Sequence, residues 1–353
     1  MPQFSIKNIA IKGISAAVPK FEYNNMSYDW VPEKERPLMI KTIGVETRRI
    51  AAKGTATTDL CFSAAEKLIN SLNWEKSEIQ ALILVTQTSD YQIPSSAIIL
   101  QDRLNLPKSC MAFDINLGCS GYVYGLSVIS SLMASGGIKK ALLLAGDVST
   151  LNANYRDKSA YPLFGDAGTA TALELDSNAE PMFFNLNSDG SGHKAIYVPH
   201  GGMRRFVDKD SFEEELIADG IYRTGIQIAL NGLEVFNFSL REVAPNVQSL
   251  LQSQEKTIDD VDYFVFHQAN RLMNETIRKK LKIDPEKFPY SIGKYGNTSS
   301  ASIPLTILHC LSKEISNGKT NLLLSGFGVG LSWGSVLLQT NNVVCTEIID
   351  YNG

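Results

Sequence analysis

The stretch FDINLGCSGYVYGL, residues 113–126, decides the fold. An apolar strand runs into a tight Gly-Cys-Ser-Gly turn, and a helix begins directly after it. Cys119 therefore stands at a helix N-terminus, where the helix dipole and unpaired N–H groups are expected to lower the pKa of its thiol. The glycines on either side permit a strained turn and the close approach of a substrate. The pattern indicates a nucleophilic cysteine.

Most lone cysteines are simply small buried apolar residues. That is the role expected for the other four, Cys61, Cys110, Cys310 and Cys345. They are scattered, without CxxC spacing or a pairing rhythm, so we expect reduced thiols in a cytoplasmic protein and no metal site.

The rest of the chain alternates short apolar runs with helical patterns, which is typical of an α/β protein with covered sheets. Residues 1–20 are expected to form a first strand, not a signal peptide. Residues 188–215, rich in Gly, Ser, His and charge, are expected to form a long surface excursion. Strands are predicted over 81–85, 141–145, 263–266 and 321–324, and helices over 58–71, 121–134, 226–243, 272–281 and 303–315.

A faint internal repeat organises this alternation. LNWEKSEIQALILV, ending at Val85, resembles LQSQEKTIDDVDYFVFH, ending at His267. GCSG at 118–121 matches GNTS at 296–299, and ALLLAGDV matches NLLLSGFG. Three matches in one order, at an offset near 180, indicate two fused copies of one unit. We predict an N-terminal half over 1–175 that carries the nucleophile and a C-terminal half over 176–353.

Composition limits the classes of protein to which the chain can belong. With 353 residues, 44% hydrophobic and 20% charged, the chain can bury a substantial core. The 33 Lys and Arg against 37 Asp and Glu leave a formal charge of −4, so nothing predicts nucleic-acid binding. The longest apolar runs have the length of a strand and are too short to span a membrane.

Two polar residues of the second half are candidate partners of Cys119. His267 follows the apolar strand VDYFVF and opens HQAN, a position suited to a site at the carboxyl end of a sheet. A structural, buried histidine is the alternative. Asn297, in KYGNTSSAS, is expected at a strand-to-helix junction, where it caps the helix or contributes to the site. Because GNTS repeats GCSG, a pseudo-two-fold axis would bring the two turns together.

The glycine cluster SGFGVGLSWG, residues 325–334, lacks the GxGxxG spacing of a dinucleotide site. Beside a nucleophile, such a loop is better suited to supplying a backbone N–H to an oxyanion hole.

These stretches together resemble the thiolase-fold condensing enzymes, above all β-ketoacyl-ACP synthase III and its relatives. The resemblance runs nearly end to end, through GVETRRIA, TSDYQIPSSA, the Cys119 segment, LFGDAGTATAL, HQAN, YGNTSSASIP and GFGVGLSWGS. It implies two pseudo-symmetric αβαβα halves that form a five-layer core. The set Cys119, His267 and Asn297 is similar to that of the type III and chalcone synthases, because thiolases have a second cysteine and elongating ketosynthases a second histidine.

The resemblance also implies a mechanism. Cys119 would take an acyl group from an acyl-CoA or acyl-ACP, with the backbone N–H groups of Cys119 and Val329 holding the oxyanion. Malonyl-ACP would then lose CO2, and the side chains of His267 and Asn297 would stabilise the enolate. That enolate would attack the acyl-cysteine and give a β-ketoacyl product, in fatty-acid or polyketide-like biosynthesis. No cofactor is expected beyond the CoA or phosphopantetheine of the substrates.

Further roles follow from the same resemblance. Asn270 and Gly232 match positions that contact the phosphopantetheine arm, and Phe327 matches an aromatic beside the catalytic histidine. Ile93 matches a residue that enters the partner subunit's acyl pocket. We therefore expect a homodimer, joined across the strand that leads to the nucleophile, with acyl carrier protein as a partner.

The chain departs from the family where the CoA nucleotide is held. The family has a Trp and an Arg there, and Leu38 and Thr42 fall at those places, with Trp30 or Lys41 as possible substitutes. Two further basic positions correspond to Leu272, with Arg271 next to it, and to Lys158. We therefore expect a carrier-protein-bound or unusual acyl donor in place of acetyl-CoA.

Two other functions stay open from the sequence. One is transfer of the Cys119-bound acyl group to an alcohol or amine, and the other is a non-catalytic ketosynthase partner subunit. A retained Asn297 favours condensation over transfer, and an intact nucleophile argues against the non-catalytic subunit.

Overall fold

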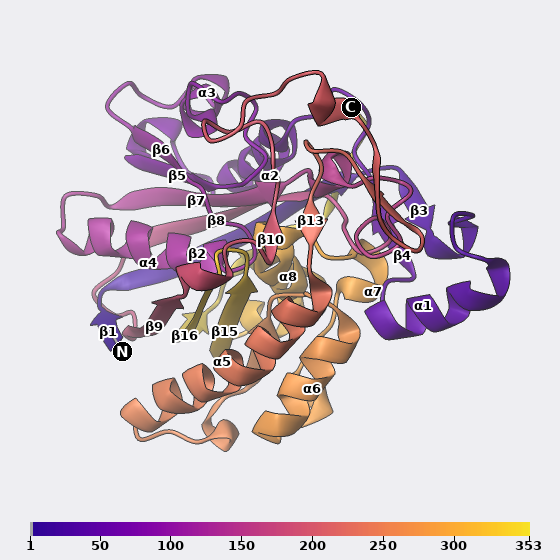
Figure 1. Cartoon of the computed structure of the whole chain (residues 1–353). Helices are drawn as coiled ribbons and strands as arrows, with labels where there is room; N and C mark the ends of the chain where they lie inside the picture. Colours follow the sequence, from indigo (N-terminus) through magenta and orange to yellow (C-terminus); the bar gives the residue numbers. More distant parts are fainter. Residues whose placement is uncertain (1–2) are drawn as a thin grey trace.

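The computed structural model describes residues 3–353 and contains two large sheets whose faces are covered by helices (Figure 1). The first sheet has the order β17-β2-β8-β7-β5-β6, with β18 also beside β2, and the second has the order β1-β9-β16-β15-β14. The first sheet comprises β2 (Ile9–Pro19), β5 (Ala81–Val85), β6 (Met111–Ile115), β7 (Lys140–Asp147), β8 (Ala167–Leu175), β17 (Val344–Cys345) and β18 (Ile349–Tyr351). The second comprises β1 (Gln3–Ile6), β9 (Met182–Ser188), β14 (Tyr263–Phe266), β15 (Lys319–Gly328) and β16 (Ser332–Asn341).

Helices divide the molecule into five layers. Helix α2 (Thr57–Ser71) packs on the outer face of the first sheet, and α5 (Gly232–Ser253) packs on the second, with α6 (Arg271–Leu281) beside it (Figure 1). Helices α4 (Gly121–Ala134) and α8 (Ser302–Ser316) contact strands of both sheets and form the central layer. This is the five-layer thiolase-type architecture expected from the sequence.

The two sheets repeat one pattern of strand directions. In the first, β5 is parallel to β7, and β7, β8 and β2 are successively antiparallel. In the second, β14 is parallel to β15, and β15, β16 and β9 are successively antiparallel. The segments matched in the sequence repeat end in the equivalent pairs β5 and β14, and β7 and β15. Because helices cover both faces of each sheet, strands such as β5 are buried along their whole length.

Each end of the chain joins the sheet of the other half. The expected boundary near residue 175 falls between β8 and β9, but β1 pairs with β9 and the C-terminal β18 pairs with β2. The prediction of one strand over residues 1–20 is therefore wrong: β1 and β2 belong to different sheets, and residues 1–2 lie outside the described part. Asn8, with φ of 65°, lies between the two strands.

Two other elements differ from expectation. The helix predicted over 226–243 is α5, which starts at Gly232 because the Asn231 side chain caps the Glu234 N–H. It continues past Pro245 because buried apolar residues follow at helical spacing. The surface excursion predicted over 188–215 is confirmed, because most of its residues are exposed or half-buried, and it contains β10 (Ile196–Tyr197). It continues past the predicted end through β11 (Glu215–Ala218), β12 (Ile221–Arg223) and β13 (Ala229–Leu230).

The remaining elements frame the region of the site. They are β3 (Glu22–Asn24), α1 (Arg36–Ile43), β4 (Thr47–Arg49), α3 (Ser96–Arg103) and α7 (Ile292–Tyr295). Over residues 3–353, none of the helices has the length and apolar character needed to cross a membrane.

Candidate active site

Cys119 lies in the predicted turn between β6 and α4. The turn is closed by a hydrogen bond from the Gly121 N–H to the Gly118 carbonyl (2.7 Å). A Cβ at Gly121 would lie 2.4 Å from Cγ1 of Val85, so only glycine fits where the helix starts against β5. The close packing of this turn explains why the sequence places two glycines around the cysteine.

The Cys119 thiol is buried and 7% exposed. Burial raises the pKa of the thiol to about 11, and a hydrogen bond from the backbone of Val329 opposes that rise. The expectation of a lowered pKa is therefore wrong for the free thiol, because desolvation outweighs the donors at the helix start. Gly328 (φ 153°) brings the Val329 loop close, since a Cβ there would lie 2.9 Å from the sulfur.

His267 directly follows β14, as predicted, and is 1% exposed. Burial lowers the pKa of its imidazole to about 3, so the ring is neutral. Its Nδ1 lies 2.7 Å from the hydroxyl oxygen of Ser302, at the start of α8. The Phe327 ring stands edge-on to the imidazole, with centroids 5.7 Å apart. A hydrogen bond with the backbone of Ser299 opposes the lowering of the His267 pKa.

Asn297 is held on both sides of its carboxamide. The N–H of Ser299 donates to Oδ1 (2.9 Å), and Nδ2 donates to the carbonyl of Ala269 (3.3 Å). One hydrogen of Nδ2 stays available. The predicted strand-to-helix junction is wrong: within the described residues 3–353 the second sheet has no counterpart of β6, and the short helix α7 precedes Asn297 instead. Its backbone pairs with Phe164 of the first half in an isolated bridge.

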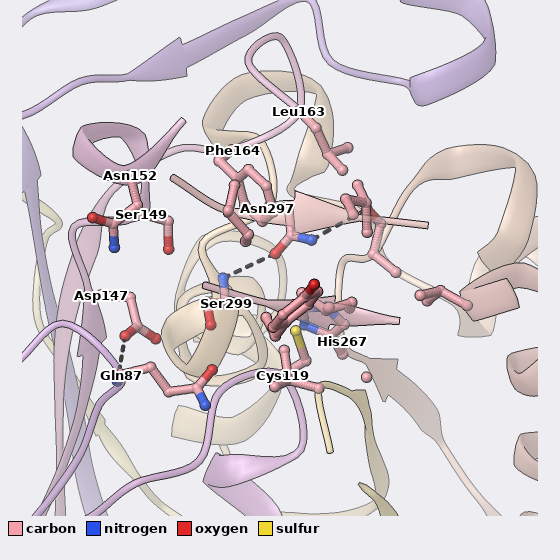
Figure 2. Close-up of a pocket in the computed structure, with 18 of the residues that line it drawn as sticks. Gln87, Cys119, Asp147, Ser149, Asn152, Leu163, Phe164, His267, Asn297 and Ser299 are labelled. Atoms are coloured by element: carbon pink, nitrogen blue, oxygen red, sulfur yellow. Dashed lines mark hydrogen bonds between the residues drawn. The ribbon is translucent and has the colours of Figure 1, made fainter. Parts of the chain in front are cut away.

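The three side chains line one cavity of about 240 Å³ (Figure 2). Cys119 comes from the first half, and His267 and Asn297 come from the second. Four more of the predicted residues line the same cavity: Val329, Phe327, Asn270 and Gly232. Ile93 does not line it and is 86% exposed on the surface of the chain.

The comparisons with known proteins agree with this geometry. Models of 3-oxoacyl-[acyl-carrier-protein (ACP)] synthase III match residues 113–190, and its C-terminal model matches 251–340. A β-ketoacyl-[acyl-carrier-protein] synthase III of Clostridioides difficile is 31% identical over 93% of this chain and 97% of its own. The chain belongs to the β-ketoacyl-ACP synthase III family of condensing enzymes.

Solved structures of this family share the whole fold. A 3-oxoacyl-(acyl-carrier protein) synthase from Burkholderia xenovorans LB400 has a TM-score of 0.93 at 36% identity, covering 99% of both chains. The synthase III of Pseudomonas aeruginosa PAO1 has a TM-score of 0.83 at 27% identity, covering 96% of this chain and all of that one.

Asp147, which the sequence analysis missed, joins the two halves of this synthase III-family chain beside the cavity. Its carboxylate accepts hydrogen bonds from the Ser300 hydroxyl (2.7 Å) and the Gln87 N–H (2.8 Å). Burial raises the pKa of Asp147, and these donors oppose the rise. The signal in the sequence was an acidic residue at the end of the apolar strand ALLLAGD.

The residues proposed to hold a CoA nucleotide are occupied by contacts within the chain. The Trp30 indole donates to the Gly220 carbonyl (3.0 Å), and Lys158 pairs with Asp219 (2.9 Å). The Arg271 guanidinium lies 3.6 Å from the centre of the Tyr290 ring. Leu38, on α1, and Leu272, on α6, are exposed by 68% and 51%.

Proposed function

We propose that the chain transfers an acyl group from a thioester to Cys119 and condenses it with a malonyl thioester, with loss of CO2. The observation that carries this proposal is one cavity that holds a cysteine thiol and two neutral N–H donors, His267 and Asn297. The reaction uses only groups of the chain and of its thioester substrates. It makes the chain an acyltransferase of the 3-oxoacyl-ACP synthase III type.

In the first step, the Cys119 sulfur forms a bond to the acyl carbon and the bond from that carbon to the carrier sulfur breaks. The proton lost by the Cys119 thiol is balanced by the proton gained by the departing thiolate. The backbone N–H groups of Cys119 and Val329 are the proposed oxyanion donors. The hydrogen bond of Val329 to the sulfur supports this assignment, because it shows a donor directed at the reacting atom.

In the second step, breakage of the bond between the malonyl carboxylate and C2 leaves an enolate. The negative oxygen of this enolate is stabilised by hydrogen bonds from neutral N–H donors. Burial keeps His267 neutral, and hydrogen bonds hold the Asn297 carboxamide in place. Each residue can therefore donate an N–H hydrogen bond to the enolate oxygen. The enolate carbon then bonds to the acyl carbon on Cys119 and releases its sulfur.

Acyl transfer from Cys119 to an alcohol or amine is the second candidate function. It needs the nucleophile and a base but no second donor. The two hydrogen bonds that fix the Asn297 carboxamide at the cavity favour condensation.

We propose that acyl carrier protein delivers the donor. Trp30, one of the two possible substitutes for a nucleotide site, already donates to a carbonyl within the chain, and Lys158, at another basic position, pairs with Asp219 on the surface. Asn270 and Gly232, at the starts of α6 and α5, are proposed to contact the phosphopantetheine arm.

We also propose a cytoplasmic homodimer. All five cysteines are free thiols, which suits a reducing compartment. The strand β6 leads to the nucleophile, lies at the edge of the first sheet and exposes Met111, and Ile93 projects from a nearby loop. An edge strand of this kind is available for pairing with a second copy.

The test is the mass of the intact protein after incubation with a panel of acyl-CoA and acyl-ACP donors, followed by malonyl-ACP. The proposal predicts an adduct on wild type that is absent from Cys119→Ala, and CO2 release with a β-ketoacyl product on addition of malonyl-ACP. No adduct with any donor would refute the assignment of Cys119. An adduct released only by alcohols or amines would replace condensation by acyl transfer.

A further inference from the structure

One wall of the active-site cavity is polar. It is formed where three neighbouring strands of the first sheet end, at β5, β6 and β7. Gln87 follows β5, Asn116 follows β6, and Ser149 and Asn152 follow β7, and all four side chains line the cavity. Figure 2 shows Gln87, Ser149 and Asn152 on the same side of Cys119, with Gln87 nearer to the nucleophile.

The wall is held in place by buried hydrogen bonds. The Asp147 carboxylate is 1% exposed and accepts the Gln87 N–H (2.8 Å), while Thr88 Oγ1 accepts the Val148 N–H (2.9 Å). A Cβ at Gly118 would lie 2.4 Å from Oε1 of Gln87, so the carboxamide stands against the turn of the nucleophile. These contacts fix the loops at the ends of β5 and β7.

The polar side chains of this wall have bonding capacity to spare. Within residues 3–353, the Gln87 side chain makes a single long hydrogen bond, from Nε2 to Oδ1 of Asn116 (3.4 Å). In Figure 2 no hydrogen bond joins the side chains of Ser149 or Asn152 to the other residues drawn. This wall therefore presents amide and hydroxyl groups to an acyl group on the Cys119 sulfur, whereas Leu163, Phe164 and Ile228 make other parts of the lining apolar.

The other end of the cavity lies at the starts of α5 and α6. It is lined by Gly232, Val235, Asn270 and Met273. On the proposed function, on which this inference rests, the carrier arm enters here. An acyl group on Cys119 therefore extends the other way, along the wall of Gln87 and Ser149.

We propose that the acyl donor of this chain is a short acyl thioester whose chain carries a hydroxyl or carbonyl oxygen. An unsubstituted alkyl chain beside the wall offers no partner to the polar groups of the half-buried Ser149 and Asn152, which costs free energy. An oxygen on the chain replaces the lost water and lets the site discriminate by hydrogen bonding. The acylation is the same exchange as above: the Cys119 sulfur gains the acyl carbon, and the carrier leaves as its thiol.

The experiment compares 3-hydroxybutyryl-ACP, with both enantiomers tested, and butyryl-ACP as donors of equal carbon number. The rate of adduct formation on Cys119 is followed by intact-protein mass, with Cys119→Ala as the blank. For wild type we expect the better hydroxyacyl enantiomer to react at least about tenfold faster than butyryl. Gln87→Leu should remove most of that preference, and Ser149→Ala should lower the ratio of the two rates about threefold.

The control is Gln252→Leu, the same change on the exposed face of α5, which should keep the wild-type ratio. Gln87 is itself exposed, so its variant is expected to fold, and its reaction with butyryl-ACP checks that it does. Equal rates for the two donors on wild type, or a ratio unchanged in Gln87→Leu and Ser149→Ala, would overturn this inference and leave the proposed function standing. No adduct from either donor, with an adduct from another donor of the panel, would also overturn this inference alone, whereas no adduct from any donor would overturn both.

Discussion

The hydroxyl oxygen of Ser302 lies 2.7 Å from Nδ1 of His267. The same oxygen lies 3.4 Å from the backbone nitrogen of Gln268 and accepts its N–H. Its own hydrogen can be donated to Nδ1, and in that tautomer the single proton of the neutral imidazole lies on Nε2. In this tautomer, which we propose for the reaction, His267 is a hydrogen-bond donor toward the cavity.

Ser302→Ala should therefore weaken enolate stabilisation more than acylation. Loss of one neutral hydrogen bond, worth about 1 kcal/mol, should lower CO2 release from malonyl-ACP about fivefold, with adduct formation nearly unchanged. Single-turnover assays of the two half-reactions measure this split. Ser312→Ala on the same helix, away from the cavity, is the matched control. An equal loss in both half-reactions would show that Ser302 serves stability alone.

The pH dependence of the Cys119 thiol follows from its burial. With a pKa of about 11, the thiolate fraction should rise about tenfold per pH unit from neutral pH toward that value. Alkylation by iodoacetamide, read by mass against Cys119→Ala, should rise in the same way. No step is expected near pH 6 to 7, because the His267 pKa is lowered to about 3. A plateau beginning below about pH 8 would show a stabilised thiolate instead.

Asp147 should matter for stability as well as for the site. Asp147→Ala leaves the Ser300 N–H and the Gln87 N–H without their acceptor, whereas the Ser300 hydroxyl keeps a second one, the Val85 carbonyl (3.3 Å). We expect the free energy of unfolding to fall by about 1–3 kcal/mol, measured by equilibrium urea denaturation. Asp219→Ala, which removes a fully exposed carboxylate, should change it by less than about 0.5 kcal/mol. Equal effects of the two substitutions would contradict the anchoring role of Asp147.

The choice of carrier is expected to depend on α1. Wild type should accept the same acyl group faster from ACP than from CoA, because Leu38 and Thr42 offer no nucleotide contact. The double change Leu38→Trp and Thr42→Arg should raise acylation by acyl-CoA and leave acylation by acyl-ACP unchanged. Competition assays with the two donors test this. Faster reaction of wild type with acyl-CoA would contradict the proposed carrier.

Much of the architecture was predictable from local sequence pattern. The turn at Cys119 and the position of His267 follow from strand and helix signals within a few residues, and α4 has the predicted bounds. The pairing of β1 with β9 was not predictable, because it depends on contacts between residues far apart in sequence. Asn297 was found through the repeat, although its neighbours form α7 and not a strand.

The electrostatics of the site were the least predictable part. A helix start alone suggests a lowered thiol pKa, but the burial that raises it comes from the packing of both halves around Cys119. Asp147, Ser300 and Ser302 were missed for the same reason: their partners lie in the other half or 35 residues away. The chemical type of a site residue can be predicted from the neighbouring sequence, whereas its burial and its hydrogen-bond partners depend on the fold.

The most direct test of the central claim is the pair of half-reactions in Asn297→Ala. In the proposed reaction, Cys119 from the first half carries the acyl group, while Asn297 and His267 from the second stabilise the enolate. Adduct formation should stay close to the wild-type rate, and CO2 release from malonyl-ACP should fall about 10²–10³-fold, corresponding to loss of one oxyanion donor. Equal loss of both half-reactions, or CO2 release at the wild-type rate, would contradict the account.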